Sequence, residues 1–204
     1  MTHNSLRLAI LAGLTAALSL PAAAATSDWK IDPAHSSAQF AVRHLGISTV
    51  RGAFTKVTGT VRSDDQDVTK SSVEVTIDTD SVDTRVPDRD NDLRSERFFD
   101  VAKYPTITFK SRKVEQAGAG KLKVTGDLTI HGTTREVILD VDGPTPAIKD
   151  PWGNQRAAAN ATTKINRQEF GMKFNDKMPT GDLLVGDDIT ITIDVEMIRP
   201  GAVK

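Results

Sequence analysis

The chain has 204 residues and a nearly balanced charge, with 26 Lys and Arg against 27 Asp and Glu. This balance argues against nucleic acid as a partner, because a phosphate-backbone binder needs a strongly basic face. No polybasic segment is present that would attract an anionic lipid surface. The absence of cysteine excludes a disulfide framework and a lipid anchor attached to cysteine.

Residues 1–25 have the pattern of a secretory signal peptide. Arg7 supplies positive charge, residues 8–20 form an apolar run, and Ala22 to Ala25 supply small residues for cleavage. The run is too short to span a bilayer, which needs about 20 residues, and a buried first helix is the less favoured alternative. We expect cleavage after Ala24 or Ala25, a mature domain at 26–204 in the periplasm or outside the cell, and no stable membrane insertion.

Short segments of alternating polarity follow one another through the rest of the chain, which is typical of half-buried β-strands. Turn residues such as His131-Gly132 and Gly186-Asp187 separate most of them. We expect about eight strands, at residues 36–43, 52–62, 73–78, 106–110, 122–130, 137–142, 156–166 and 189–197.

Two segments interrupt this alternation. Residues 87–99 predict a short helix or helical loop, in which Asp90 and Arg94 are spaced to pair on one helical face. Residues 167–178 form a second insertion that is rich in apolar side chains. No internal repeat or linker indicates a second domain.

Strands joined by such short turns pair antiparallel, and their apolar faces must close over one another as a barrel or a sandwich. An eight-stranded barrel has an interior that side chains can fill or that can hold one small ligand. Whether the interior is filled by side chains or holds a ligand is therefore the question that decides the function.

Five segments together resemble the YceI-like, polyisoprenoid-binding family. They are residues 29–54, 94–100, 104–111, 126–132 and 167–172, in that order over one domain length. The resemblance implies an all-β, antiparallel, eight-stranded, lipocalin-like barrel with short helical insertions. It also implies an exported protein that holds an isoprenoid or similar lipid and performs no chemistry on it. Members of that family often carry His where this chain has Asp92.

The segment 156–166 has small residues at alternate positions, namely Ala157, Ala159 and Ala161, and Gly126 likewise interrupts the apolar face of its own strand. Small residues facing a barrel interior leave volume for an apolar guest. They can equally permit an opposite wall to pack closely. The spacing alone leaves both interpretations open.

Apolar side chains at the interior and the mouth are the candidate ligand contacts. Aromatic and thioether side chains near the openings could gate a cavity, although Phe and Met are more often ordinary core residues. The candidates are Phe40, Val42, Phe54, Phe98, Phe99, Ile107, Phe109, Leu128, Ile130, Ala157, Ala159, Ala161, Phe170, Met172 and Phe174.

Arg94, Arg97 and Arg135 are candidate contacts for a diphosphate or another polar head group, because Arg suits phosphate. A solvated face with local ion pairs is the alternative for these three side chains.

We expect no metal site, no cofactor and no catalytic residue. His35 and His44 flank one strand, which separates them by roughly 25 Å if it is extended, and His131 follows another segment in a turn. The leading hypothesis is therefore a periplasmic carrier for a long apolar molecule, such as a polyisoprenoid, a quinone or a fatty-acid derivative. The rival is a dry-cored barrel that binds a protein partner in an envelope stress response. Both hypotheses are compatible with a homodimer.

Overall fold

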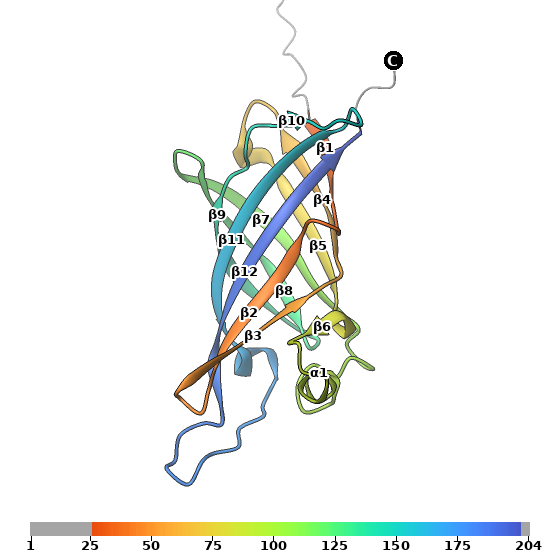
Figure 1. Ribbon diagram of the computed structural model, residues 1–204. Coiled ribbons are helices and arrows are strands. Elements are labelled where there is room, and N and C mark those ends of the chain that lie inside the picture. The colour runs from red at the N-terminus through yellow and green to blue at the C-terminus, as the bar shows by residue number, and fades with distance from the viewer. Residues whose placement is uncertain (1–25, 201–204) are drawn as a thin grey trace, which may run out of the picture.

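The computed structural model describes residues 26–200 (Figure 1). The predicted signal peptide lies outside the described residues. Within them, the helical elements are α1 (Pro87–Arg94) and the 3-10 helices η1 (Val68–Lys70), η2 (Thr79–Ser81) and η3 (Arg167–Phe170). The strands are β1 (Thr26–Ile31), β2 (Ser37–His44), β3 (Ser48–Phe54), β4 (Val57–Asp64), β5 (Ser72–Asp78), β6 (Val82–Asp83), β7 (Thr106–Gly118), β8 (Lys121–Ile130), β9 (Thr133–Asp142), β10 (Ile148–Lys149), β11 (Gln155–Asn166) and β12 (Val185–Arg199).

Eight strands form a closed antiparallel ring in the order β11-β9-β8-β7-β5-β4-β1-β12, which the pairing of β12 with β11 completes. The remaining strands β2, β3 and β6 extend the sheet beside β12, and β10 pairs with the start of β11. Closure gives each strand of the ring a neighbour on both sides, and β9 and β11 pair only over residues 140–142 and 160–162. The predicted eight-stranded barrel with short helical insertions is confirmed.

The barrel has two distinct ends (Figure 1). We call the end near β10 the upper end and the end near α1 and η3 the lower end. Two strands share one edge of β12, because β1 pairs with it at the upper end and β2 pairs with it lower down. The chain therefore bends between β1 and β2, at residues 32–36.

Arg156, at the start of β11, holds this bend. Its guanidinium donates to the carboxylates of Asp32 at 2.7 Å, Asp150 at 2.9 Å and Glu196. The hydrogen bond from Arg156 is the main reason why the pKa of Asp32 falls to about 2. Burial opposes the ionisation of Asp150, but its hydrogen bonds, including the one from Arg156, outweigh burial and lower its pKa to about 2. Ion pairs thus fasten the upper end.

The structure has four strands more than the sequence predicts, namely β1, β3 as a separate strand, β6 and β10. The segment 52–62 contains the end of β3 and most of β4, which a turn at Thr55 and Lys56 separates. Strand β1 was not predicted, because only Trp29 and Ile31 are apolar among its three buried positions and Ser27 is the third.

The predicted helical segment contains α1, but its expected ion pair does not form. Asp90 is buried and accepts hydrogen bonds from the backbone N–H of Thr84 at 2.8 Å and from its hydroxyl at 2.5 Å. Arg94 donates instead to the carbonyl oxygens of Asp80 and Val82. These bonds attach α1 to the segment before it.

Candidate functional site: an apolar cavity inside the barrel

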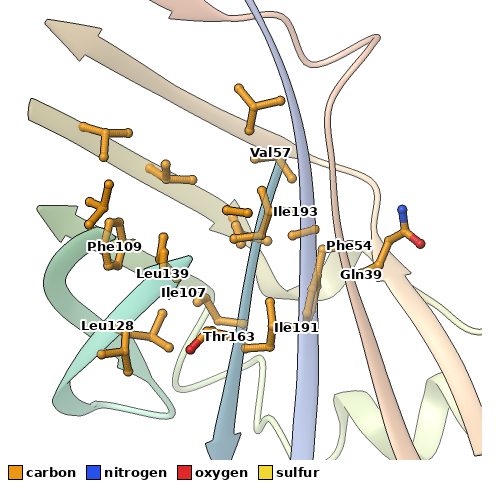
Figure 2. Close-up of a pocket in the computed structure, with 18 of the residues that line it drawn as sticks. Gln39, Phe54, Val57, Ile107, Phe109, Leu128, Leu139, Thr163, Ile191 and Ile193 are labelled. Atoms are coloured by element: carbon orange, nitrogen blue, oxygen red, sulfur yellow. The ribbon is translucent and has the colours of Figure 1, made fainter. Parts of the chain in front are cut away.

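The barrel encloses a cavity of about 280 Å³, to which all eight strands of the ring contribute side chains. Figure 2 shows Phe109 and Leu128 on one side of this space and Ile191 and Ile193 on the other. Along β12 the lining runs from Val185 to Met197, which is roughly 40 Å of strand. The lining therefore reaches from the lower end of the ring to the upper end.

The cavity lining is almost entirely apolar. Its polar members are Gln39, Ser63, Ser71, Ser72, Thr163 and Arg167. Gln39 donates to Ser37 and Asp194 and points away from the other lining side chains (Figure 2). The cavity therefore offers an apolar guest little competition from polar groups.

Arg167 is buried, with an exposed fraction of only 3%. Its guanidinium donates to the carbonyl oxygens of Met172 at 2.8 Å, Gly186 at 3.0 Å and Val185 at 3.1 Å, and to the carboxylate of Asp187 at 2.8 Å. Burial lowers the pKa of Arg167. Because protein acceptors occupy this side chain, we assign it to holding η3 against β12 rather than to a ligand.

Several inward-facing residues are only partly buried, although they point to the centre of the barrel. Val73, Val75, Ile189, Ile191 and Ile193 all pack against the main hydrophobic core and line the cavity, yet none is fully buried. A filled core would cover such side chains completely. Their partial exposure is the direct sign of a hollow interior.

The lower end of the cavity is covered by packed aromatic and thioether side chains. Phe98 and Met172 line the cavity and are buried. Phe174 packs on Phe98 with ring centroids 4.9 Å apart, and the guanidinium of Arg97 lies 4.7 Å from the centroid of Phe174. The segment after α1 and the segment after η3 thus close this end together.

The upper end of the cavity is more open. Ser72 and Pro144 are lining residues that are exposed to solvent. Ser63 and Ser71 also line this end and are half-buried. The exposed and hydroxyl-bearing lining residues thus concentrate at the upper end, which identifies it as the mouth.

The small residues of β11 and β8 have different roles. Ala159 and Ala161 line the cavity together with Thr163, whereas Ala157 packs against Trp29 and Met197. A Cβ atom added at Gly126 would lie 2.5 Å from the ring of Phe109. Gly126 therefore permits close packing, and free volume borders the small face of β11.

Most of the predicted ligand contacts lie in the lining, although their part in binding stays a prediction. Ala157, Phe170 and Phe174 do not line the cavity, since Phe170 is 1% exposed within the core and Phe174 lies outside Phe98. The predicted residues in the lining are Phe40, Val42, Phe54, Phe98, Phe99, Ile107, Phe109, Leu128, Ile130, Ala159, Ala161 and Met172.

Sequence reasoning missed the row along β12. The inward residues Ile189, Ile191, Ile193, Val195 and Met197 all line the cavity. The alternation in the predicted strand 189–197 was the signal that could have identified them, because alternate residues of a strand share one face.

None of the three candidate head-group arginines lines the cavity. Arg94 and Arg97 lie at the lower end, where Arg94 also pairs with Asp80 at 3.0 Å and Arg97 with Asp92 at 2.9 Å. Arg135 lies in a groove between β9 and β11, on the same face of β9 as the lining residues Val137 and Leu139. That groove is of mixed charge, since it includes the ion pair of Lys164 with Asp188.

The histidines lie in different surroundings. His35 and the carboxylates of Asp32 and Glu196 bring three potential ligand atoms within 4.8 Å of one another. Arg156 already donates to both carboxylates there, so a guanidinium occupies the position of a cation. His131 packs on Tyr104 with ring centroids 4.3 Å apart, and burial lowers its pKa.

The family model for the YceI-like domain matches residues 29–197, which is most of the chain. The chain belongs to the YceI-like family. Among curated relatives, a UPF0312 protein of Vibrio cholerae is 42% identical over 163 residues, covering 79% of this chain and 86% of the relative. A UPF0312 protein of Shewanella denitrificans is 40% identical over 164 residues, covering 79% and 85%.

Solved structures show the same fold. The Campylobacter jejuni YceI protein superposes with a TM-score of 0.66 and 32% identity, covering 77% of this chain and 89% of that one. Burkholderia cenocepacia BcnA gives 0.69 at 24% identity, covering 81% and 98%. A domain of Saccharophagus degradans described as polyisoprenoid binding gives 0.61 at 14% identity, covering 84% and 98%. At these identities the last two likenesses concern the fold alone.

Proposed function

We propose that this protein binds a long apolar molecule inside the barrel and carries it in the periplasm or outside the cell. The candidates are a polyisoprenoid, a quinone-like lipid and a fatty-acid-derived lipid. The observation that carries the proposal is the apolar cavity that extends between the two ends of the ring. No chemical step belongs to this function.

The partly exposed interior side chains favour this function over the dry-cored alternative. A barrel that acted only through its outer surface would gain stability by filling its interior, because well-packed cores leave few voids larger than a water molecule. The retained volume beside Ala159, Ala161 and Thr163 is therefore better explained by a guest.

The lining chemistry supports one orientation of the ligand. An apolar tail would extend toward Phe98 and Met172, where the cavity is closed. A polar group would remain at the hydroxyls of Ser63, Ser71 and Ser72 near the mouth. A buried polar group without a hydrogen-bond partner is costly, so this orientation is the favourable one.

The energetics favour long chains. Burying a methylene contributes about 0.8 kcal/mol, so one five-carbon isoprene unit gains roughly 3 to 4 kcal/mol gross. Association costs roughly 4 to 15 kcal/mol in lost freedom. One or two units would bind weakly, whereas a longer tail would bind well.

Two further observations support the ligand class and the location. The Saccharophagus degradans structure is described as a polyisoprenoid-binding domain, which makes an isoprenoid the first ligand to test. The signal-peptide pattern of residues 1–25 supports export. None of the helices within residues 26–200 is long and apolar enough to cross a membrane.

The test is extraction of the purified protein with organic solvent, followed by mass spectrometry, and then titration with prenyl compounds of increasing length. An extractable apolar compound and an affinity that rises with chain length are expected. A protein that yields no apolar compound and binds no member of the series would favour the protein-binding alternative. Equal affinity across the series would indicate an outer polar site.

A further inference from the structure

Residues 143–154 form a segment that we call the upper strap. It leaves the end of β9, crosses the upper end of the barrel through β10 and enters β11 (Figure 1). Pro144 belongs to this strap and also lines the cavity at its mouth. The start of the strap therefore borders the mouth.

The upper strap displays two large apolar side chains to solvent. Trp152 is 80% exposed and Ile148 is 65% exposed. Trp29, the other tryptophan of the chain, is only 7% exposed. A tryptophan with so much of its ring in water forgoes the large gain that burial gives this side chain.

Hydrogen bonds to its backbone groups hold the strap in place. The carboxylate of Asp150 accepts hydrogen bonds from the backbone N–H groups of Trp152 at 3.0 Å and Asn154 at 2.8 Å. Thr145 joins the strap to β11, since its N–H donates to the carbonyl of Ala158 at 2.8 Å. The exposed tryptophan thus sits on a tied turn rather than on a freely moving loop.

We propose that the upper strap docks the mouth of the barrel on a lipid membrane surface, with Trp152 and Ile148 in the interfacial region. The proposal rests on the proposed function, because a long apolar ligand has to leave and rejoin a bilayer without crossing water. Tryptophan is enriched at membrane interfaces, where its ring lies in the apolar layer and its N–H reaches the head groups.

The charge of the strap predicts what kind of contact this is. Lys149 is its only basic residue, and Asp150 is engaged by Arg156. Attraction to anionic lipid is therefore weak, and the contact depends mainly on apolar area. With two anchoring side chains the attachment is reversible, which suits a carrier that has to leave the membrane again.

The experiment uses the mature protein with vesicles of phosphatidylcholine, alone or mixed with phosphatidylglycerol. Binding is measured by flotation and by tryptophan emission, which should move to shorter wavelength as Trp152 leaves water while Trp29 gives a constant background. Trp152→Ala should lower the partition coefficient roughly tenfold. Added salt should change it little.

Ile47→Ala is the matched control. Ile47 is 79% exposed at the tip of the hairpin between β2 and β3, at the lower end of the barrel. The proposal would be overturned if the wild-type protein bound neither kind of vesicle. It would also be overturned if Ile47→Ala lowered the partition coefficient as much as Trp152→Ala does. A steep salt dependence would do so too, because charges would then make the contact.

Lipid retention is measured on the same variants by extraction and mass spectrometry. Trp152→Ala should retain its lipid, because its side chain does not line the cavity. Vesicle binding without any retained or titratable lipid would contradict the proposed function and leave docking intact. Retained lipid without vesicle binding would contradict docking alone, and would direct attention to a protein partner at the strap.

Discussion

The two ends of the barrel are built from different interactions. At the lower end Phe98 and Met172 are buried, and Arg167 donates mostly to backbone carbonyl oxygens. At the upper end Arg156 joins three carboxylates, and the lining residues Ser72 and Pro144 face solvent. We expect from this contrast that the lower end maintains the shape of the barrel, while the upper end exchanges ligand with the surroundings.

The largest effect is expected from Arg167→Ala, which removes the tie between η3 and β12. Breaking a buried pair by removing one partner costs about 3 to 5 kcal/mol, and three carbonyl oxygens lose a donor as well. Urea unfolding should show this loss in the free energy of unfolding. Arg97→Ala at the same end is the control and should cost less than about 1 kcal/mol, because the Arg97 side chain is 52% exposed. Equal losses would mean that Arg167 does not hold the lower end.

The second effect concerns the cavity between the two ends. Ala161→Phe should occupy the space of roughly four methylene groups and weaken ligand binding about 100-fold. The free energy of unfolding should stay unchanged or rise if the ring fills empty volume, whereas overpacking would cost about 1 to 3 kcal/mol. Titration and unfolding of the ligand-free protein measure the two quantities.

Two further variants serve as the control and the comparison for that test. Ile138→Phe on β9, where Ile138 is 50% exposed, should change neither quantity. Ala159→Phe should destabilise more than Ala161→Phe, because a Cβ atom at Gly143 would already lie 3.1 Å from the Ala159 side chain. If Ala161→Phe left ligand binding intact, β11 would not border the binding site.

The sequence predicts the ring better than it predicts the ends. Alternation is a local signal, so it located most strands and placed residues such as Phe109 and Leu128 on the inner face. It could not separate β3 from β4, because the turn at Thr55 and Lys56 carries no Gly, Pro, Asn or Asp.

The closed lower end depends on contacts between distant segments. Arg167 in η3 reaches residues 185–187 at the start of β12. Phe98 meets Phe174 in loops whose conformation no periodicity describes. For the same reason the sequence did not single out Trp152, since a tryptophan in a polar segment gives no sign of whether it will be covered.

Acid should loosen the upper end before the lower end. The pKa of Asp32 falls from 3.8 to about 2 on folding, so its contribution is complete above about pH 4 and is lost as the pH falls through 2. After allowance for solvent screening this amounts to about 1 to 2 kcal/mol. Arg156 donates to Asp150 as well as to Asp32, and the pKa of Asp150 is also about 2. Hydrogen exchange should therefore show the N–H groups of Trp152 and Asn154 opening first, since both donate to Asp150.

The control for the acid experiment is Asp32→Asn, which should be less stable at pH 7 and show a flatter acid limb. Lower-end N–H groups, such as that of Met172, which donates to the carbonyl of Arg167, should stay protected over the same range. Simultaneous opening of both ends would mean that the barrel unfolds as one unit and that the ends are not independent.

The smallest effect is expected from Phe174→Ala, and it decides which end releases the ligand. The change removes an aromatic pair worth about 0.5 to 1.5 kcal/mol, so the free energy of unfolding should fall by about that amount. Release of a bound prenyl probe into acceptor vesicles should keep its wild-type rate, because the proposed exit route passes Ser72 and Pro144 rather than Phe98. Ile47→Ala, at the same end and outside the lining, controls for a general loosening of the lower loops. Faster release from Phe174→Ala than from this control would reveal a second route through the lower end, and the division of roles between the ends would then fail.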